Sequence, residues 1–183
     1  TFGIIQLPSD IIFEKEVYPL LSQIDNINWR TQKLNFTFIN EEITKENFES
    51  AKFTIVSAAS TFIPKLIHEY GSIDIMGFAC SSMSFTLGRE NINYFINKGY
   101  PNLKNITDMA SSIINAIKVL KYKNISLFTP YDNELHNICK LCLTNEIEDL
   151  KIVSDYNLNI NKDSIISSIT PATIINLIKN LVN

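Results

Sequence analysis

Residues 72–88, SIDIMGFACSSMSFTLG, are the stretch from which the fold of this chain can be worked out. An apolar run stops abruptly at Cys80, two serines follow, and an amphipathic stretch continues to about Lys98. This pattern predicts a buried strand, a sharp turn and a helix. Cys80 would then lie at the carboxyl end of the strand and the amino end of the helix. Open α/β sheets bind their ligands at that edge.

The predicted turn favours negative charge. Unpaired N–H groups and the helix dipole stabilise an anion at a helix amino end, and the same field allows a thiol to lose its proton near neutral pH. We therefore predict that Cys80 is a nucleophile or base beside an oxyanion pocket formed by the hydroxyls and N–H groups of Ser81 and Ser82. Two plainer interpretations stay open. A cysteine that ends a strand is often inert core, and a serine here is a common helix N-cap.

Composition argues against several classes of protein. The chain has 183 residues, a net charge of −3 and no basic stripe, which gives no support for nucleic-acid binding. No apolar run approaches the roughly 20 residues that span a bilayer, so we expect no membrane association. Three unevenly spaced cysteines and no charged leader predict a cytoplasmic location. Gly-rich phosphate loops are absent from the sequence, which disfavours dinucleotide and ATP enzymes.

Predicted strands and helices alternate along the whole chain with short connections. Strands are expected at 2–7, 34–38, 73–79, 103–106, 124–129 and 151–156. Helices are expected at about 11–22, 45–68, 81–98, 107–122, 132–149 and 171–181, with a helical turn at 164–168. The alternation predicts an α/β fold of parallel sheets covered by helices on both faces. The weakest seam, at 99–106, divides it into two lobes, residues 1–102 and 103–183, and we expect the second to be incomplete at its C-terminus.

Two further residues follow predicted strands and so belong to the same sheet edges. Asp10 comes after the first strand and either contacts a polar substrate group or only caps the next helix. Tyr131 comes after the strand at 124–129. If the two lobes face each other, its hydroxyl can donate to a carboxylate across the cleft, and otherwise it is a surface tyrosine.

The helix expected at 132–149 carries the remaining reactive side chains. Cys139 and Cys142 form a C-x-x-C in the middle of this helix, without a second pair to complete a zinc site, and we predict that both are core cysteines. His136 on the same helix is predicted to be exposed. Cys80 therefore has no obvious histidine partner for a hydrolase dyad.

Three stretches resemble the Asp/Glu racemase superfamily: GFACSSMSF, NLKNITDMASSIINAIKVL and NISLFTPYDNEL. The likeness is strongest to the branch that holds arylmalonate decarboxylase and maleate cis-trans isomerase, and it extends over nearly the whole chain. It implies two similar α/β lobes with the active site between them. It also implies a reaction that needs neither cofactor nor metal, with two cysteines facing the substrate carbon from opposite sides.

Within this resemblance, Cys80 matches the first cysteine, and Ser81 and Ser82 match a pair of carboxylate-binding hydroxyls. Tyr131 matches the tyrosine of the pocket. The decarboxylase type carries glycine where this chain has Cys80, so the thiol indicates isomerisation or racemisation. The second cysteine of the family would lie on a strand beyond Asn183.

Two other polar positions of the pocket are assigned through the same resemblance. Asp10 stands where isomerases of this branch tend to carry an amide, and a carboxylate there changes the direction of the hydrogen bond. A further polar position falls at Asn161 or at Asp163. We take Asn161 as the candidate substrate-binding residue.

Together, the residues and the resemblance predict a cofactor-independent isomerase or racemase of small dicarboxylic acids. The Cys80 thiolate would add to an activated double bond or remove a proton next to a carboxylate, and the neighbouring hydroxyls would stabilise the charge that develops. The alternatives are a decarboxylase, a catalytically incomplete chain that only binds a small carboxylate, and a structural domain. A homo-oligomer is left open.

Overall fold

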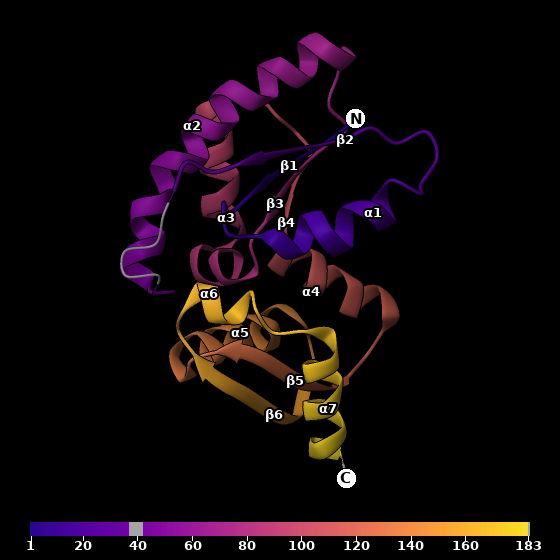
Figure 1. Ribbon diagram of the computed structural model, residues 1–183, viewed down its shortest axis with the longest axis vertical. Coiled ribbons are helices and arrows are strands. Elements are labelled where there is room, and N and C mark those ends of the chain that lie inside the picture. The colour runs from indigo at the N-terminus through magenta and orange to yellow at the C-terminus, as the bar shows by residue number, and fades with distance from the viewer. Residues whose placement is uncertain (37–41, 183) are drawn as a thin grey trace.

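The computed structural model describes residues 1–36 and 42–182 (Figure 1). Its strands are β1 (Phe2–Gln6), β2 (Trp29–Lys33), β3 (Ile75–Ala79), β4 (Ile106–Asp108), β5 (Asn124–Tyr131) and β6 (Lys151–Ile160). Its α-helices are α1 (Tyr18–Leu21), α2 (Lys45–Tyr70), α3 (Ser81–Gly99), α4 (Met109–Leu120), α5 (Asn133–Glu146), α6 (Asp163–Ile166) and α7 (Pro171–Val182), and a π-helix, η1 (Phe13–Val17), precedes α1. None of the described helices is both long and apolar enough to cross a bilayer.

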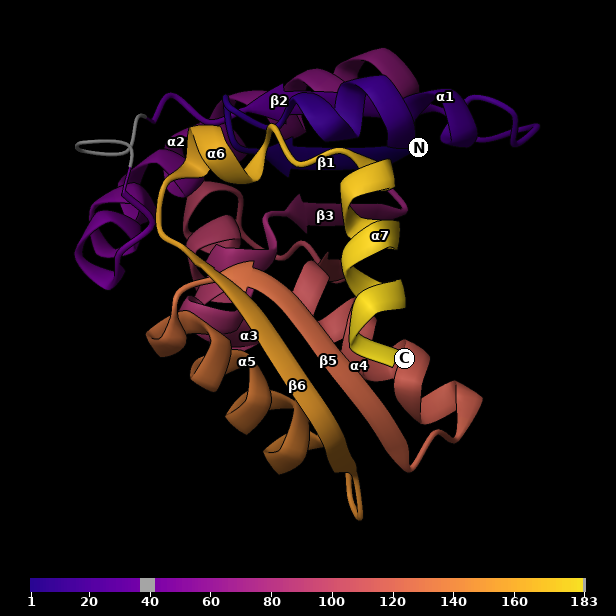
Figure 2. The ribbon, with the colours of Figure 1, turned by 60° about the horizontal axis from the view of Figure 1, so that its bottom comes forward.

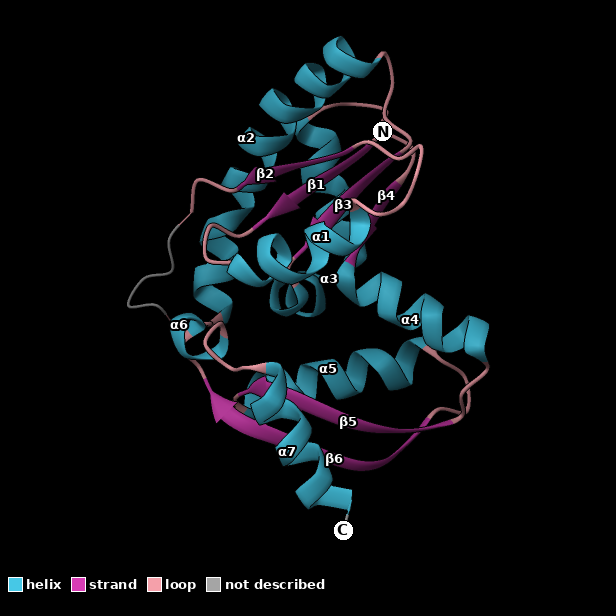
Figure 3. Cartoon of the chain, turned by 45° about the vertical axis from the view of Figure 1, so that its right-hand side comes forward, coloured by secondary structure: helices cyan, strands magenta, loops and turns pink. Residues whose placement is uncertain are grey.

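The strands form two parallel sheets, as the alternating pattern predicts. The first has the order β2-β1-β3-β4, and the second pairs β5 with β6. Figure 3 shows the sheets in separate halves of the molecule with helices packed around each, which confirms the α/β class. Because β4 pairs with β3, the seam predicted between residues 102 and 103 falls before the last strand of the first sheet.

The second strand of the chain is the one that the sequence pattern misplaces. It runs from Trp29 to Lys33, whereas the prediction was 34–38; residues 34–36 lie outside any strand, and 37 and 38 lie outside the described residues. Among the described strands β2 lies at the sheet edge and pairs with β1 alone, so its polar side chains can stay in contact with water and no apolar alternation is needed. Leu34, which suggested a strand, is a buried core residue directly after β2.

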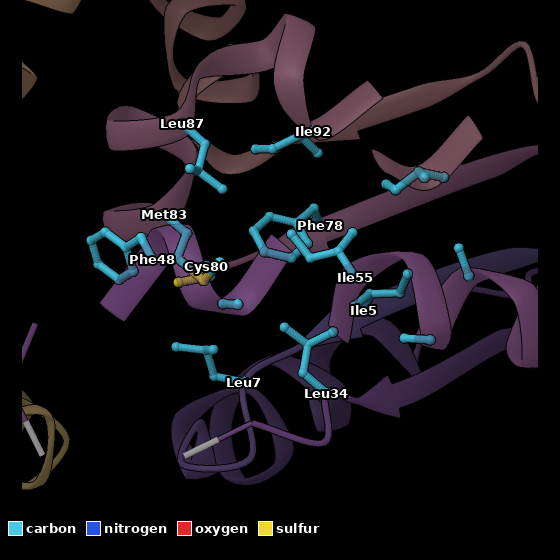
Figure 4. Packing of buried hydrophobic residues seen from close by; sticks show 14 of the residues in the cluster. Ile5, Leu7, Leu34, Phe48, Ile55, Phe78, Cys80, Met83, Leu87 and Ile92 are labelled. Carbon is cyan, nitrogen blue, oxygen red and sulfur yellow. The ribbon is translucent and has the colours of Figure 1, made fainter. Parts of the chain in front are cut away.

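One apolar core extends through both halves of the molecule. Its fully buried side chains include Phe48 from α2 and Phe78 from β3 (Figure 4). It continues into Tyr131, Leu135 and Cys139 of the second half. The core therefore holds β5 and α5 against α3, so that the ends of β3 and β5 keep a fixed relation. The prediction that Cys139 is a core cysteine is confirmed.

The close packing of α2 against α3 depends on Gly99. A Cβ atom at this position would approach the backbone oxygen of Val56 and come within 2.8 Å of the Ala59 Cβ. Backbone atoms inside a helix cannot turn away, so one of the two helices would have to shift. Gly3 is a contrasting case, because a Cβ there meets only the side-chain ends of Met76 and Leu66.

We expect Gly99→Ala to lower the free energy of unfolding by about 1–3 kcal/mol, the usual cost of overpacking. The matched variant Gly3→Ala should lose less, because side-chain ends can rotate where backbone cannot. Urea unfolding followed by circular dichroism measures both. Equal losses in the two variants would show that the α2–α3 contact is not the constraint.

Candidate functional site

The turn at Cys80 forms as the sequence predicts. β3 ends at Ala79, and Cys80 is the extended N-cap residue of α3. The Cys80 carbonyl accepts hydrogen bonds from the Ser84 N–H (2.9 Å) and the Ser84 hydroxyl (2.7 Å), which fix the first turn of the helix. The Cys80 sulfur makes no capping hydrogen bond at the helix end, although the nearby Met83 N–H favours its thiolate form.

Two side-chain contacts assemble the predicted residues into one group. The Cys80 sulfur lies 3.3 Å from the Ser82 hydroxyl oxygen, and the Ser81 hydroxyl oxygen lies 2.7 Å from that of Tyr131. Tyr131 is the last residue of β5, so the second contact joins the two halves of the molecule across the ends of their sheets. The sequence prediction that Tyr131 faces the Cys80 turn therefore agrees with this geometry.

A cavity of about 320 Å³ opens at this point. Most of the exposed area of its wall is apolar, and the apolar side chains are Leu7, Ile12, Phe13, Val17, Ile43, Ala79, Met109 and Ile166. Its polar side chains are Ser9, Asp10, Cys80, Ser81, Ser82, Tyr131, Asp163 and Ser167. Among the described residues that line it there is no lysine or arginine, so hydroxyl and N–H groups are the available partners for an anion.

Two carboxylates reach the cavity, from Asp10 and from Asp163. The Asp10 side chain accepts a hydrogen bond from the Phe13 N–H (3.0 Å), so it caps the following helix as well as lining the cavity. Burial raises the pKa of Asp10, and the charge of Asp163 acts in the same direction.

The structure does not bring Asn161 to the cavity. Asn161 is exposed, and Asp163, two residues later, lines the wall in its place. The sequence pattern ended the last strand at residue 156, whereas β6 continues to Ile160 and α6 begins at Asp163. This longer strand sets which of the two residues reaches the sheet edge.

The sequence predicts that the Cys80 thiol ionises near neutral pH, and this prediction is wrong for this structure. Burial raises the pKa of the thiol to about 11, against the lowering effects of the Ser82 hydroxyl and the Met83 N–H. The negative charges of Asp163 and Asp10 raise it further. The helix end and the serine do favour the thiolate, as predicted, but loss of solvation is the larger effect.

We expect Cys80 to react slowly with iodoacetamide at pH 7 and progressively faster from pH 9 towards 11. Only the thiolate is alkylated, and a pKa near 11 leaves a very small thiolate fraction at neutral pH. Peptide mass spectrometry after timed quenching gives the rate at each cysteine. The half-buried Cys142 is the internal reference, and a Cys80 rate that is already maximal at pH 7 would contradict the effect of burial.

His136 is buried, and the prediction that it is exposed is wrong. Its Nδ1 lies 2.9 Å from the Thr129 hydroxyl, and its Nε2 lies 2.9 Å from a carboxylate oxygen of Asp155. Lys140 binds the same carboxylate at 2.7 Å. These contacts tie α5 to β5 and β6 just before Tyr131, so His136 supports the site without lining the cavity. No group of three His, Cys, Asp or Glu among the described residues is arranged to hold a metal ion.

Comparison with known proteins places the fold. No protein-family model and no curated protein sequence matches this chain. Among solved structures, maleate isomerase Iso from Pseudomonas putida S16 matches with a TM-score of 0.76 and 18% identity, over 97% of this chain and 71% of that one. The chain has the fold of the maleate isomerases.

Two further structures widen the comparison. The Nocardia farcinica maleate cis-trans isomerase, in a form with a covalently bound succinylcysteine intermediate, gives a TM-score of 0.76 at 12% identity, over 98% of this chain and 71% of that one. Arylmalonate decarboxylase gives 0.64 at 17% identity, over 96% and 69%. These neighbours are enzymes, and at such identities the likeness establishes the fold rather than a particular reaction.

Proposed function

We propose that this protein is an isomerase or racemase that acts on a small carboxylic acid through Cys80. The observation that carries the proposal is the shared cavity, in which a thiol lies beside the hydroxyl pair formed by Ser81 and Tyr131. The fold neighbours support it, because one is a maleate isomerase captured with a succinylcysteine intermediate.

The hydroxyl pair suits a carboxylate. One hydroxyl of the pair donates to the other, which leaves one proton free for a carboxylate oxygen, and both can donate to a carboxylate that replaces their mutual bond. The first N–H groups of α3 open at the same place. Burial raises the pKa of the Tyr131 phenol above its usual range, so the phenol stays a donor at neutral pH. These donors would hold the carboxylate and stabilise it as it gains charge.

Two reactions use this arrangement. In the first, the Cys80 sulfur forms a bond to one carbon of a double bond, and the π electrons move onto the conjugated carboxylate. Rotation about the remaining single bond and loss of the thiolate then give the other geometric isomer. In the second, the thiolate takes a proton from the carbon next to the carboxylate, and the electron pair of the C–H bond moves onto the carboxylate.

A decarboxylase is the second candidate, and one fold neighbour is such an enzyme. Loss of CO₂ from a malonate leaves the same enediolate charge, which the Ser81–Tyr131 pair could stabilise. The largely apolar cavity wall would suit an aryl substituent.

The test is to incubate the protein in D₂O with maleate, aspartate, leucine and phenylmalonate, each followed by proton NMR. Fumarate formed from maleate, or deuterium next to a carboxylate of aspartate or leucine, would support the proposal. Loss of CO₂ from phenylmalonate alone would select the decarboxylase. A shift in melting temperature with these acids but no turnover of any of them would leave a binding protein and contradict the enzyme.

A further inference from the structure

The polar groups of the cavity differ in the charge that they can accept. The Ser81–Tyr131 pair offers hydrogen-bond donors, whereas Asp10 and Asp163 offer carboxylate oxygens. Hydroxyl and N–H donors suit an anionic end of a ligand. Carboxylate oxygens only accept hydrogen bonds when ionised, so they suit a cationic or donor-rich group.

A dicarboxylate would meet a repulsive environment here. Among the described lining residues no lysine or arginine offsets the two aspartates, and the cavity is partly enclosed in apolar side chains, where charges interact more strongly than in water. One carboxylate of such a ligand can use the hydroxyl pair. The second would lie in a cavity that already holds two like charges.

The ionisation of the Cys80 thiol gives a separate reason to expect a cationic group beside the two aspartates. The charges of Asp163 and Asp10 both act against ionisation of the thiol. A cation bound between these carboxylates would offset that effect and favour the thiolate, whereas an added anion would disfavour it. Ligand binding would thus prepare the sulfur for the reaction.

The rest of the cavity wall indicates the third part of the ligand, which is its side chain. Leu7, Phe13 and Val17 lie on one lining segment, and Ile43 and Met109 come from elsewhere in the chain. These side chains exclude a second charged group and suit a hydrocarbon substituent.

We infer that the substrate is an α-amino acid with an apolar side chain, bound by its carboxylate at Ser81 and Tyr131 and by its ammonium at Asp10 and Asp163. This inference rests on the proposed function, of which it specifies the substrate class. In the reaction the Cα–H bond breaks, the proton goes to the Cys80 sulfur, and the electron pair moves onto the carboxylate. Return of a proton to Cα restores the amino acid.

Two ligands of nearly equal shape separate the alternatives. Leucine and isobutylmalonate share the isobutyl group and one carboxylate, but isobutylmalonate has a second carboxylate where leucine has its ammonium. Isothermal titration calorimetry at pH 7 measures both affinities on the wild-type protein. We expect leucine to bind at least about tenfold more tightly, the effect of one charge-assisted hydrogen bond gained instead of a repulsion.

The variant Asp10→Asn/Asp163→Asn removes both charges with little change of shape, and asparagine is as good a helix N-cap as aspartate at position 10. Leucine should lose about tenfold or more in affinity, and isobutylmalonate should gain. The control is Glu90→Gln, which removes one charge from an exposed position on α3 and should change neither affinity.

The outcomes separate this inference from the proposed function. Equal or tighter binding of isobutylmalonate by the wild type, or no binding of leucine, would overturn the inference. Turnover of maleate in that case would leave the proposed function standing. Leucine binding that depends on both aspartates, without deuterium exchange at Cα, would support the ligand class and overturn the reaction.

Discussion

Replacing Cys80 with serine should lower kcat on the order of 10³-fold or more while the protein stays folded, because the substitution removes the thiol, the strongest nucleophile among the described residues that line the cavity. Serine is a good helix N-cap, and its smaller oxygen fits where sulfur is packed. The hydroxyl of serine ionises far less readily than the thiol, so neither addition to a double bond nor proton removal can proceed at the wild-type rate. Steady-state kinetics of the wild type and Cys80→Ser give the ratio.

A matched substitution separates the role of this thiol from cysteine chemistry elsewhere. Cys142→Ser changes a half-buried cysteine of α5 that lies outside the cavity, and it should keep wild-type kcat. Melting temperatures of both variants check that folding is preserved. If Cys80→Ser kept a tenth or more of the wild-type kcat, the thiol would not be the reacting group.

The pH dependence of the wild-type reaction adds a second check on Cys80. A thiol pKa raised to about 11 means that the thiolate fraction grows as pH rises, so kcat/KM should increase from pH 7 towards pH 10. If the reaction instead required a group that must stay protonated, kcat/KM would fall as pH rises. A flat profile in this range would show that ionisation of free Cys80 does not limit the reaction.

Local features of this chain could be predicted from the sequence, and long-range ones could not. The strand–turn–helix at Cys80 follows from an apolar run that stops at two serines, and the position of Tyr131 follows from the end of the next sheet's strand. The burial of His136 depends on Thr129 and Asp155, which lie on two neighbouring strands. No periodicity within the helix indicates such partners.

The pKa of Cys80 likewise has one cause that the sequence shows and one that depends on the fold. The helix end beside Cys80 is visible in the sequence, and it does favour the thiolate. The desolvation that outweighs it depends on side chains that meet around the sulfur (Figure 4). They come from elements far apart in the chain, whose arrangement Figure 2 shows. Asp163 reaches the cavity because β6 continues to Ile160, a length that depends on its pairing with β5.

Tyr131→Phe should lower kcat about 10²-fold, the usual effect of removing one donor from an oxyanion site. The Tyr131 hydroxyl is the contribution of the second half of the molecule to the hydroxyl pair, and burial keeps it protonated through the neutral range. Ser81→Ala should have a similar effect, since it removes the other member. Tyr122→Phe, at an exposed tyrosine, is the control and should change nothing.

The double variant of Ser81 and Tyr131 tests whether the two hydroxyls act as one unit. At 2.7 Å each orients the other, so loss of either leaves its partner misdirected, and the combined loss in kcat should be clearly smaller than the product of the single losses. Fully multiplicative effects would mean that the two groups act on different parts of the substrate. In that case the carboxylate would not be held across the two sheet ends, and the Cys80 sulfur would have no fixed reacting carbon to face.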